Sequence, residues 1–257
     1  MKEKVIEECT SIIQNSTNIV VLTGAGISTE SGIPDFRSRT GIYQETPEEL
    51  LSIDYFYDHP KKFYQFAMEN LHHPRAVPNI GHELLAKWEE KSKITHLITQ
   101  NIDGLHQKAG SKNVIEFHGT MKTCSCMNCG KTYLAEEMVK RMKESDHFYV
   151  CNHCETQTEE HHYIKPDVVL FGDSGQWFTY DGFKTITDMI HRADCLLVLG
   201  SSLKVTPFST FPRDRQPGVP LIIVNKGTTA YDLEPNTYVI QNSIRDTLKK
   251  IDLNLEA

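Results

Sequence analysis

The sequence predicts an α/β fold built on a parallel β-sheet with helices packed on both of its faces. Three observations support this prediction. Several short runs are apolar throughout, which is typical of strands buried on both faces. Helical patterns separate several of these runs, as the crossovers of a parallel sheet require. Most runs end in small or polar residues, and the chain of 257 residues has room for one large domain, alone or with a small insertion.

The expected elements follow from these patterns along the chain. Apolar runs predict strands at 19–23, 94–98, 114–117, 168–171, 195–199 and 221–224. Helices are predicted at about 3–15, 181–192 and 243–252. The pattern from Thr46 to Trp88 is also helical, but Pro60, Pro74 and Pro78 should break it into separate helices.

Small and polar residues follow the predicted strands. They are Gly24, Gln100, Asn101, His118, Ser201, Ser202 and Asn225. In open parallel sheets the carboxyl ends of the strands share one edge, and ligands bind outside that edge. The sequence therefore predicts a ligand site there.

A glycine turn follows the first predicted strand directly. Gly24 and Gly26 would let the backbone turn tightly and approach a pyrophosphate, whose charge free N–H groups at a helix start would meet. The spacing is not the fingerprint of hydride-transfer enzymes, because Thr29 stands in place of a third glycine. A polar loop at 34–41 also replaces the expected second strand. The turn favours a nucleotide site, although a turn that binds nothing is the alternative.

Four cysteines form two closely spaced pairs. Cys126 and Cys129 are followed, after 21 intervening residues, by Cys151 and Cys154. Each pair directs two thiolates at one point, and two pairs complete the tetrahedron of a closed, structural zinc site. Zinc would stabilise an insert at 120–165 that is too small for a core of its own.

Other side chains could compete for this metal. Cys124 is a rival ligand, because it lies two residues before Cys126. His153, His161 and His162 are weaker candidates that we expect to be exposed. Five reduced thiols without metal are the remaining alternative.

Composition restricts the class of function. A net charge of −7 argues against nucleic acid as the main partner and is compatible with a basic peptide substrate. No segment approaches the roughly twenty apolar residues of a membrane span. The polar segment Met1–Lys4 lacks the apolar core of a signal peptide, and seven cysteines without such a signal favour metal binding over disulfides. We therefore expect a cytoplasmic enzyme.

The motifs together resemble those of the sirtuins, a family of NAD-dependent protein-lysine deacylases. The matching segments are Gly24–Ser28, Gly32–Arg37, Thr99–His106, His118–Gly119, the four paired cysteines, Pro166–Asp173 and Gly200–Leu203. The resemblance runs from about residue 5 to residue 250, with the motifs in one order. The bacterial cytoplasmic branch of the family is the most similar.

This resemblance implies a chain of two domains. Residues 1–36, 76–118 and 167–257 would form a Rossmann-like, NAD-binding domain. A helical module at 37–75 and a zinc module at 119–166 would form the smaller domain. NAD and an acylated lysine would enter the cleft between the domains from opposite sides, and we expect acetylated lysine-containing proteins as partners and a monomeric chain.

The resemblance also implies the chemistry. NAD is consumed as a co-substrate: the acetyl group of lysine passes to ADP-ribose, and nicotinamide, 2′-O-acetyl-ADP-ribose and free lysine are formed. His118 would act as general base on a ribose hydroxyl, for which an ordinary histidine pKa of about 6.5 is well suited. Asn101 would hold a water and ribose hydroxyls. A strand-end histidine that caps backbone groups is the structural alternative for His118.

The remaining site residues are implied in the same way. Asp103 and the Ile102 backbone would bind the carboxamide, although Asp103 could also cap the following helix. Phe36 would cover the nicotinamide pocket. The full cofactor set is Gly24, Ala25, Gly26, Thr29, Asp35, Phe36, Arg37, Gln100, Asn101, Ile102, Asp103, His118, Gly200, Ser201, Ser202, Asn225 and Asn242. The acyl-lysine site would be lined by Val169, Phe171 and Gly172.

The sequence departs from the family pattern on the peptide side. Asp173 stands where glutamate is usual, and the segment 207–212 is bulkier than is common. Ala67 and Asn70 occupy the positions where removers of acidic acyl groups carry a Tyr-x-x-Arg pair, which predicts acetyl over succinyl. A mono-ADP-ribosyltransferase and a non-catalytic NAD or ADP-ribose sensor are the alternative functions.

Overall fold

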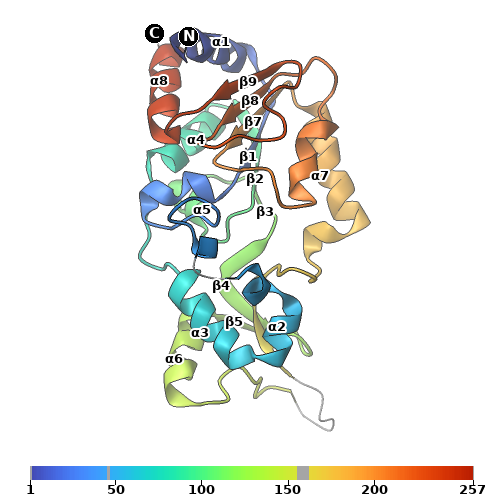
Figure 1. The fold of residues 1–257 in the computed structure, drawn as a ribbon. Coiled ribbons are helices and arrows are strands. Elements are labelled where there is room, and N and C mark those ends of the chain that lie inside the picture. The colour runs from blue at the N-terminus through green and yellow to red at the C-terminus, as the bar shows by residue number, and fades with distance from the viewer. Residues whose placement is uncertain (1, 45–46, 155–161, 257) are drawn as a thin grey trace.

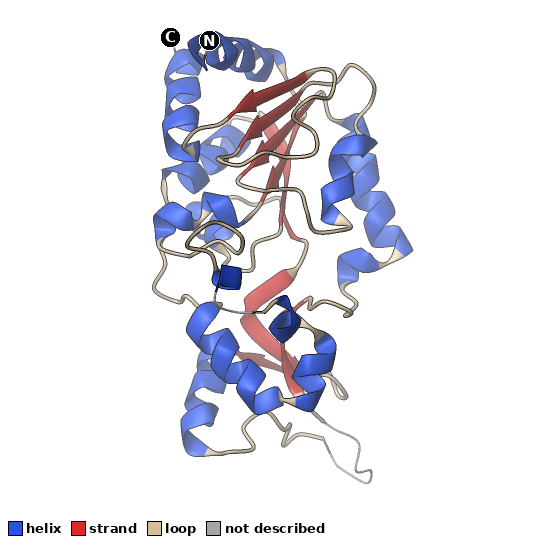
Figure 2. Cartoon of the chain, in the orientation of Figure 1, coloured by secondary structure: helices blue, strands red, loops and turns tan. Residues whose placement is uncertain are grey.

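Two β-sheets lie in different halves of an elongated molecule (Figure 1). The structure is a computed structural model that describes residues 2–44, 47–154 and 162–256. The larger sheet and most of the helices occupy one half, next to both ends of the chain (Figure 2). The smaller sheet lies in the other half.

The larger sheet has six parallel strands. In chain order they are β1 (Ile19–Thr23), β2 (Ile94–Thr99), β3 (Val114–Glu116), β7 (Cys195–Leu199), β8 (Leu221–Val224) and β9 (Thr237–Ile240). Their spatial order is β3-β2-β1-β7-β8-β9, so the direction of winding reverses between β1 and β7. This is the strand order of a Rossmann fold, and ligands bind at the reversal. The prediction of a parallel α/β sheet is confirmed.

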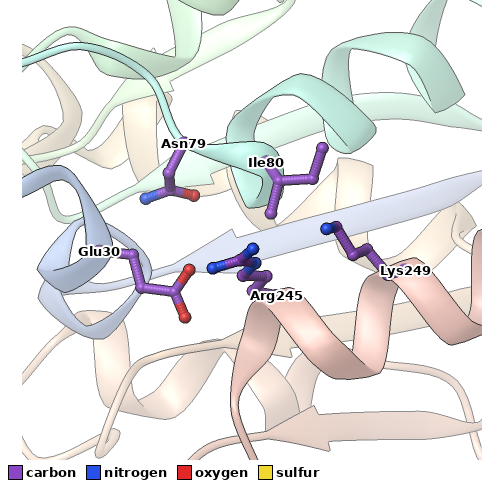
Figure 3. A pocket seen from close by; sticks show the side chains of 5 residues that line it. All are labelled: Glu30, Asn79, Ile80, Arg245 and Lys249. Atoms are coloured by element: carbon purple, nitrogen blue, oxygen red, sulfur yellow. The ribbon is translucent and has the colours of Figure 1, made fainter.

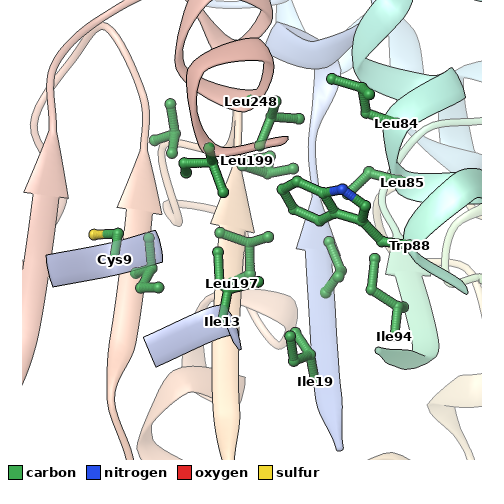
Figure 4. Packing of buried hydrophobic residues seen from close by; sticks show 14 of the residues in the cluster. Cys9, Ile13, Ile19, Leu84, Leu85, Trp88, Ile94, Leu197, Leu199 and Leu248 are labelled. Atoms are coloured by element: carbon green, nitrogen blue, oxygen red, sulfur yellow. The ribbon is translucent and has the colours of Figure 1, made fainter. Parts of the chain in front are cut away.

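Helices cover both faces of this sheet, because alternate strand side chains point to opposite sides. Ile19 and Val21 of β1 belong to one hydrophobic cluster, and Val20 and Leu22 belong to another. The first face is covered by α1 (Lys2–Asn15), α4 (Ile80–Glu90) and α8 (Ile244–Glu256). Figure 4 shows Trp88 of α4 in this cluster between Leu248 and the strands. The second face is covered by α7 (Tyr180–Arg192) and the 3-10 helix η6 (Phe208–Asp214).

The smaller sheet is antiparallel, with the order β5-β4-β6. Its strands are β4 (Gly119–Cys126), β5 (Thr132–Leu134) and β6 (Ile164–Val168). Three helices lie beside it: α2 (Ile53–Asp58), α3 (Pro60–Asn70) and α6 (Ala135–Glu144). Phe56 and Phe63 from the helices share one buried cluster with Met121 and Ile164 from the sheet. The cysteine segment therefore shares a core with the preceding helices, while the exact domain boundaries stay a prediction.

Two points about the predicted strands need correction, and one about the helices is confirmed. Residues 168–171 do not form a strand of the parallel sheet, because β6 ends at Val168 and pairs with β4 instead. The edge strand β9 was not predicted, since only its last residue, Ile240, is fully buried. The predicted helix breaks are confirmed: α3 begins at Pro60, and Pro74 and Pro78 lie between α3 and α4.

Shorter helices complete the fold. They are η1 (Ala25–Ile27), η2 (Thr29–Ser31), η3 (Ile42–Gln44), η4 (Glu48–Leu51), α5 (Leu105–Ala109) and η5 (Gln176–Phe178). Thr46, where the helical pattern was expected to begin, lies outside the described residues. Across the described ranges, no helix has the length and apolar character needed to cross a lipid bilayer.

Candidate active site

The turn after β1 packs backbone against backbone on the turn after β7. Gly26 N–H donates to the Gly200 carbonyl at 2.9 Å, and Gly24 N–H donates to the Leu199 carbonyl at 3.1 Å. A Cβ added to Gly24 would lie 2.9 Å from the Gly200 oxygen, and one added to Gly26 would lie 2.8 Å from the Gly200 Cα. Glycine is therefore required at both positions by the contact of two strand ends, at the point where the sheet reverses.

Two single turns of 3-10 helix follow, so the helix expected to start here is short and is not an α-helix. The N–H groups of Ile27 and Ser28 donate to the carbonyls of Gly24 and Ala25, both at 3.1 Å. The Thr29 hydroxyl donates to the carbonyl of Gly26 at 3.0 Å. A phosphate at this turn would therefore meet loop backbone and not the dipole of an α-helix.

Gln100 connects three of the strand ends. Its N–H donates to the Thr23 carbonyl at 2.9 Å, and its Oε1 accepts from the Ser201 hydroxyl at 2.8 Å. Its backbone also makes a hydrogen bond with the His118 side chain. The structure thus brings His118, Gln100 and the Gly24 turn together at one edge of the sheet, as the strand-end pattern predicted.

Asn101 and Asp103 share a hydrogen-bonding partner, Ser28. Asn101 is buried, and its Nδ2 donates to Ser28 Oγ at 3.1 Å and to the Gly24 carbonyl at 3.3 Å. Ser28 Oγ donates to Asp103 Oδ2 at 2.6 Å. Asp103 Oδ1 accepts from the N–H of Leu105 at 2.9 Å, so the carboxylate also caps α5, as the structural alternative predicted.

His118 follows β3 and is surrounded by aromatic rings. Its ring centroid lies 5.2 Å from that of Phe117 and 6.3 Å from those of Phe178 and Phe208. Burial lowers the pKa of His118 to about 4, and the hydrogen bond with the Gln100 backbone opposes this shift only in part. The imidazole is therefore neutral at pH 7, well away from the ordinary value of 6.5 that we expected it to keep.

A pair of buried histidines lies behind these residues, and neither was given a role in the sequence analysis. The rings of His82, in α4, and His106, in α5, are 4.8 Å apart. His106 Nε2 is 3.0 Å from Thr23 Oγ1, whose hydroxyl donates to Thr99 Oγ1 at 2.8 Å. Burial lowers the pKa of His82 to about 4 and that of His106 well below its usual value, so both are neutral at pH 7. The signals in the sequence were the segment Thr99–His106, which ends in one of the two histidines, and the three-residue spacing from Asn79 to His82, which the structure shows to be a capping box.

The loop with Asp35, Phe36 and Arg37 is folded on itself. Ser38 N–H donates to Asp35 Oδ1 at 2.9 Å, and the Phe36 ring lies 5.2 Å from that of Tyr43. Arg37 forms an ion pair with Glu48 at 3.0 Å and lies over the Tyr43 ring. Phe36 and Ile102 pack against the same hydrophobic cluster of the smaller sheet. A phosphate would have to compete with Glu48 for the Arg37 guanidinium.

The predicted acyl-lysine residues lie on the chain that leaves β6. Val169 N–H donates to the His118 carbonyl at 2.8 Å, which holds this segment beside the strand end. Phe171 exchanges backbone hydrogen bonds with Leu51 and Ile53 at 2.9 Å, and its side chain is 41% exposed. Gly172 has a positive φ of 81°, so it ends the extended segment in a turn.

The remaining predicted residues follow β7, β8 and β9. Ser201 is buried, and its hydroxyl donates to Gln100 Oε1. The side-chain amide of Asn225 donates to the Gly227 carbonyl. Asn242 N–H donates to the Ile240 carbonyl at 3.0 Å.

A separate pocket opens between η2, α4 and α8 and contains none of the predicted residues. It is lined by Glu30, Asn79, Ile80, Arg245 and Lys249 (Figure 3).

The four paired cysteines converge on one point. The sulfur atoms of Cys126, Cys129, Cys151 and Cys154 all lie within 4.8 Å of one another. Two of these S···S distances are 3.5 Å and 3.9 Å, and Zn–S bonds of about 2.3 Å in a tetrahedron require about 3.8 Å. The four-thiol donor set and its dimensions therefore fit zinc.

The competing ligands lie outside this group. Cys124 is fully buried, and burial raises its pKa to about 12, so it stays a thiol. His153 is exposed as expected, but His162 is buried, which corrects our expectation. His161 falls outside the described residues. The backbone N–H of His153 donates to Cys151 Sγ at 3.4 Å, and the side-chain amide of Asn128 donates to Cys154 Sγ at 3.7 Å. Such N–H donors are expected around metal thiolates.

Comparison with known proteins agrees with this arrangement. The family model described as Sir2 family matches residues 24–207, which include the glycine turn, the strand-end cluster and the cysteines. The chain belongs to the Sir2 family. Two Sir2 relatives are each named NAD-dependent protein deacetylase. The one from Thermotoga maritima is 42% identical over 88% of this chain and 89% of its own length. The one from Staphylococcus epidermidis is 40% identical over 98% of both chains.

Solved Sir2 structures have the same fold. One, described as Sir2 with p53 peptide and NAD+, has a TM-score of 0.82 and 38% identity, over 97% of this chain and 98% of the other. Another is a complex of Sir2 with an inhibitor, 2′-O-acetyl-ADP-ribose and deacetylated p53 peptide. It has a TM-score of 0.80 and 37% identity, over 96% and 98% of the two chains.

The residues of this Sir2 chain also suit a dinucleotide co-substrate. Both amide hydrogens of Asn101 are engaged within the protein, so its Oδ1 is the atom left to accept from a hydroxyl. The neutral His118 imidazole can accept a proton at pH 7. Hydrogen-bond and proton acceptors therefore lie beside the point where the winding of the sheet reverses, which is where a Rossmann fold binds its nucleotide.

Proposed function

We propose that this chain is an NAD-dependent protein-lysine deacetylase that transfers the acetyl group to ADP-ribose and releases nicotinamide and free lysine. One observation carries the proposal: Gln100 links a neutral, partly buried His118 to the glycine turn at the point where the winding of the sheet reverses. The names of the Sir2 relatives, and the ligands in the solved Sir2 structures, support the same activity.

Each residue has a part in the proposal. Bound NAD supplies the glycosidic bond to nicotinamide and the ribose that accepts the acetyl group. His118 accepts a proton from a ribose hydroxyl, and its aromatic surroundings keep it unprotonated and exclude water. Asn101 Oδ1 accepts from ribose hydroxyls or a water, and Asp103 is held by Ser28 and the start of α5 to meet the carboxamide.

We propose positions along the same edge for the other predicted cofactor residues. Ala25, Thr29 and Arg37 face the phosphates, with Gly200, Ser201, Ser202, Asn225 and Asn242 on the adenosine side. Asp35 holds the loop that carries Phe36, through its bond to Ser38. The acyl-lysine passes Val169, Phe171 and Gly172, whose segment is tied to the His118 carbonyl.

The acyl group is proposed to be acetyl and not succinyl. Ala67 is fully buried in the core of the smaller sheet, and the Asn70 amide donates to the Phe66 carbonyl. Neither position supplies a cation that could pair with an acidic acyl group.

We further propose a structural zinc ion at the four paired cysteines and a cytoplasmic, monomeric enzyme. The convergence of the four sulfur atoms supports the metal. All seven cysteines of the chain are free of disulfides, which supports a reducing compartment.

The test is product analysis by mass spectrometry. The purified chain is incubated with an acetyl-lysine peptide, with and without NAD, and with the succinylated peptide for comparison. We expect free lysine, nicotinamide and acetyl-ADP-ribose only when acetyl-peptide and NAD are both present. ADP-ribose attached to protein would instead favour a mono-ADP-ribosyltransferase, and NAD binding without nicotinamide release would favour a sensor.

A substitution separates catalysis from binding in the same assay. His118→Ala should keep the affinity for NAD within about threefold and lose roughly 10²–10⁴-fold in turnover, the range for removal of a general base. Deacetylation at the wild-type rate would remove His118 from that role.

A further inference from the structure

A buried polar network lies directly behind the proposed active site and reaches it through Ser28. Its outer members, His82 and His106, come from the helices α4 and α5, and both are almost fully buried. Neither histidine has a part in the reaction proposed above. A buried polar side chain requires a hydrogen-bonding partner, so the partners of His82 show what it holds in place.

His82 is fixed at the start of α4. The Asn79 N–H donates to His82 Nδ1 at 3.2 Å, while Asn79 Oδ1 accepts from the Gly81 N–H at 2.9 Å. The Asn79 amide also donates to the Ile27 carbonyl at 2.8 Å and to Ser31 Oγ at 2.9 Å, which ties α4 to the loop after β1 (Figure 3 shows Asn79 at the start of α4). Because Nδ1 accepts a hydrogen bond, the proton of a neutral His82 must be on Nε2.

The opposite ring nitrogen faces Ser28. His82 Nε2 lies 3.4 Å from Ser28 Oγ. The single hydroxyl hydrogen of Ser28 is committed to Asp103 at 2.6 Å, so Ser28 Oγ can only accept from its other two neighbours. Those neighbours are His82 Nε2–H and the Asn101 amide, at 3.1 Å. The two ends of the network therefore require the same tautomer of His82.

The direction of these hydrogen bonds fixes the two residues at the site. With Ser28 Oγ as an acceptor, Asn101 must present Nδ2 to it and turn Oδ1 the other way. With the Ser28 hydrogen directed at Asp103, the carboxylate is held on one side by Ser28 and on the other by the Leu105 N–H. A reversed His82 tautomer would place two lone pairs opposite each other at Ser28.

We propose that His82 is a positioning residue: it orients the Ser28 hydroxyl, and through it the Asn101 amide and the Asp103 carboxylate, for NAD. The assignment rests on the proposed function, but the orientation of these groups exists in the protein without NAD. The groups that face His82 are Asp103, the His106 ring and the Ser28 hydroxyl.

Two substitutions at position 82 separate the role of each ring nitrogen. In His82→Asn, the side-chain oxygen can still accept from the Asn79 N–H, but the donor to Ser28 is lost. In His82→Gln, an amide N–H can reach Ser28, but the acceptor for Asn79 is lost. The first variant keeps the start of α4, and the second keeps the link to the active site.

The kinetic expectation follows from this difference. His82→Asn should lower kcat/KM for NAD about tenfold, the equivalent of one hydrogen bond, with little change in melting temperature. His82→Gln should restore most of the rate in spite of a lower melting temperature. The proposal would be overturned if each variant lost rate in proportion to its loss of stability, since His82 would then be structural only.

A measurement without NAD keeps the test independent of the reaction. ¹⁵N NMR of the wild-type protein at pH 7 should show His82 protonated on Nε2. The side-chain amide signals of Asn101 should shift in His82→Asn and stay close to wild type in His82→Gln. An Nδ1-protonated His82, or Asn101 signals that do not respond to His82→Asn, would overturn the proposal even if neither variant folded well enough for kinetics. A wild-type protein with the expected signals but no deacetylation would refute the proposed function and leave the orientation of Ser28 intact.

Discussion

Acidification should destabilise the fold through His118. In the unfolded chain the imidazole titrates near 6.5, whereas burial lowers its pKa in the folded chain to about 4. Between these two values the unfolded state binds more protons than the folded state, so stability falls as the pH falls. The stability is therefore fully present above pH 6.5 and is lost progressively down to about pH 4.

The size of the effect follows from the two pKa values. Between pH 7 and pH 5 the unfolded histidine takes up about three quarters of a proton and the folded one takes up less than about a tenth. The loss attributable to His118 is about 2 kcal/mol over this interval. His82, whose pKa burial also lowers to about 4, should add a loss of similar size.

Urea unfolding of the wild type and of His118→Gln at both pH values isolates the contribution of His118. Every other titrating group is common to the two proteins, so His118→Gln should lose about 2 kcal/mol less than the wild type between pH 7 and pH 5. Equal losses in the two proteins would refute the reasoning.

The kinetic counterpart is the acid limb of the pH profile of kcat/KM for NAD, which should have its inflection near pH 4. An inflection at 6.5 would show that His118 is not desolvated in the free enzyme.

Two further predictions concern the glycine turn and the cysteines. Gly26→Ala should cost about 1–3 kcal/mol of stability and weaken NAD binding, because its Cβ would meet the Gly200 backbone at 2.8 Å. Unchanged urea unfolding and unchanged calorimetric NAD affinity would contradict this. Cys126→Ser should release zinc, measured by elemental analysis, and lower the melting temperature, whereas Cys124→Ser should keep the metal. Loss of zinc from both would make Cys124 a ligand.

The local part of the site could be predicted because its signals are local. Gly24, Gln100, Asn101 and His118 each follow an apolar run, and parallel strands bring their carboxyl ends to one edge whatever the loops do. The four paired cysteines were recognisable from their spacing alone, since a tetrahedral metal site needs two closely spaced pairs.

Other features depend on contacts between distant segments. His82 and Ser28 are 54 residues apart, and Ser28 and Asp103 are 75 apart, so no periodicity connects them. Residues 168–171 have the composition of a buried strand, but β6 pairs with β4 and ends at Val168. A half-exposed edge strand such as β9 gives too weak an apolar pattern to be recognised.

The amino-acid sequence by itself determined five of the six strands of the parallel sheet, the edge of that sheet that carries the polar residues, and the thiols available for a metal. These depend on side-chain type and on spacing along the chain. Only the tertiary structure decided the protonation of His118, the orientation of Asn101 and the need for glycine at 24 and 26. Each of these depends on what surrounds a group in space: aromatic rings that exclude water, a serine held by a distant histidine, and a neighbouring backbone less than 3 Å from a Cβ.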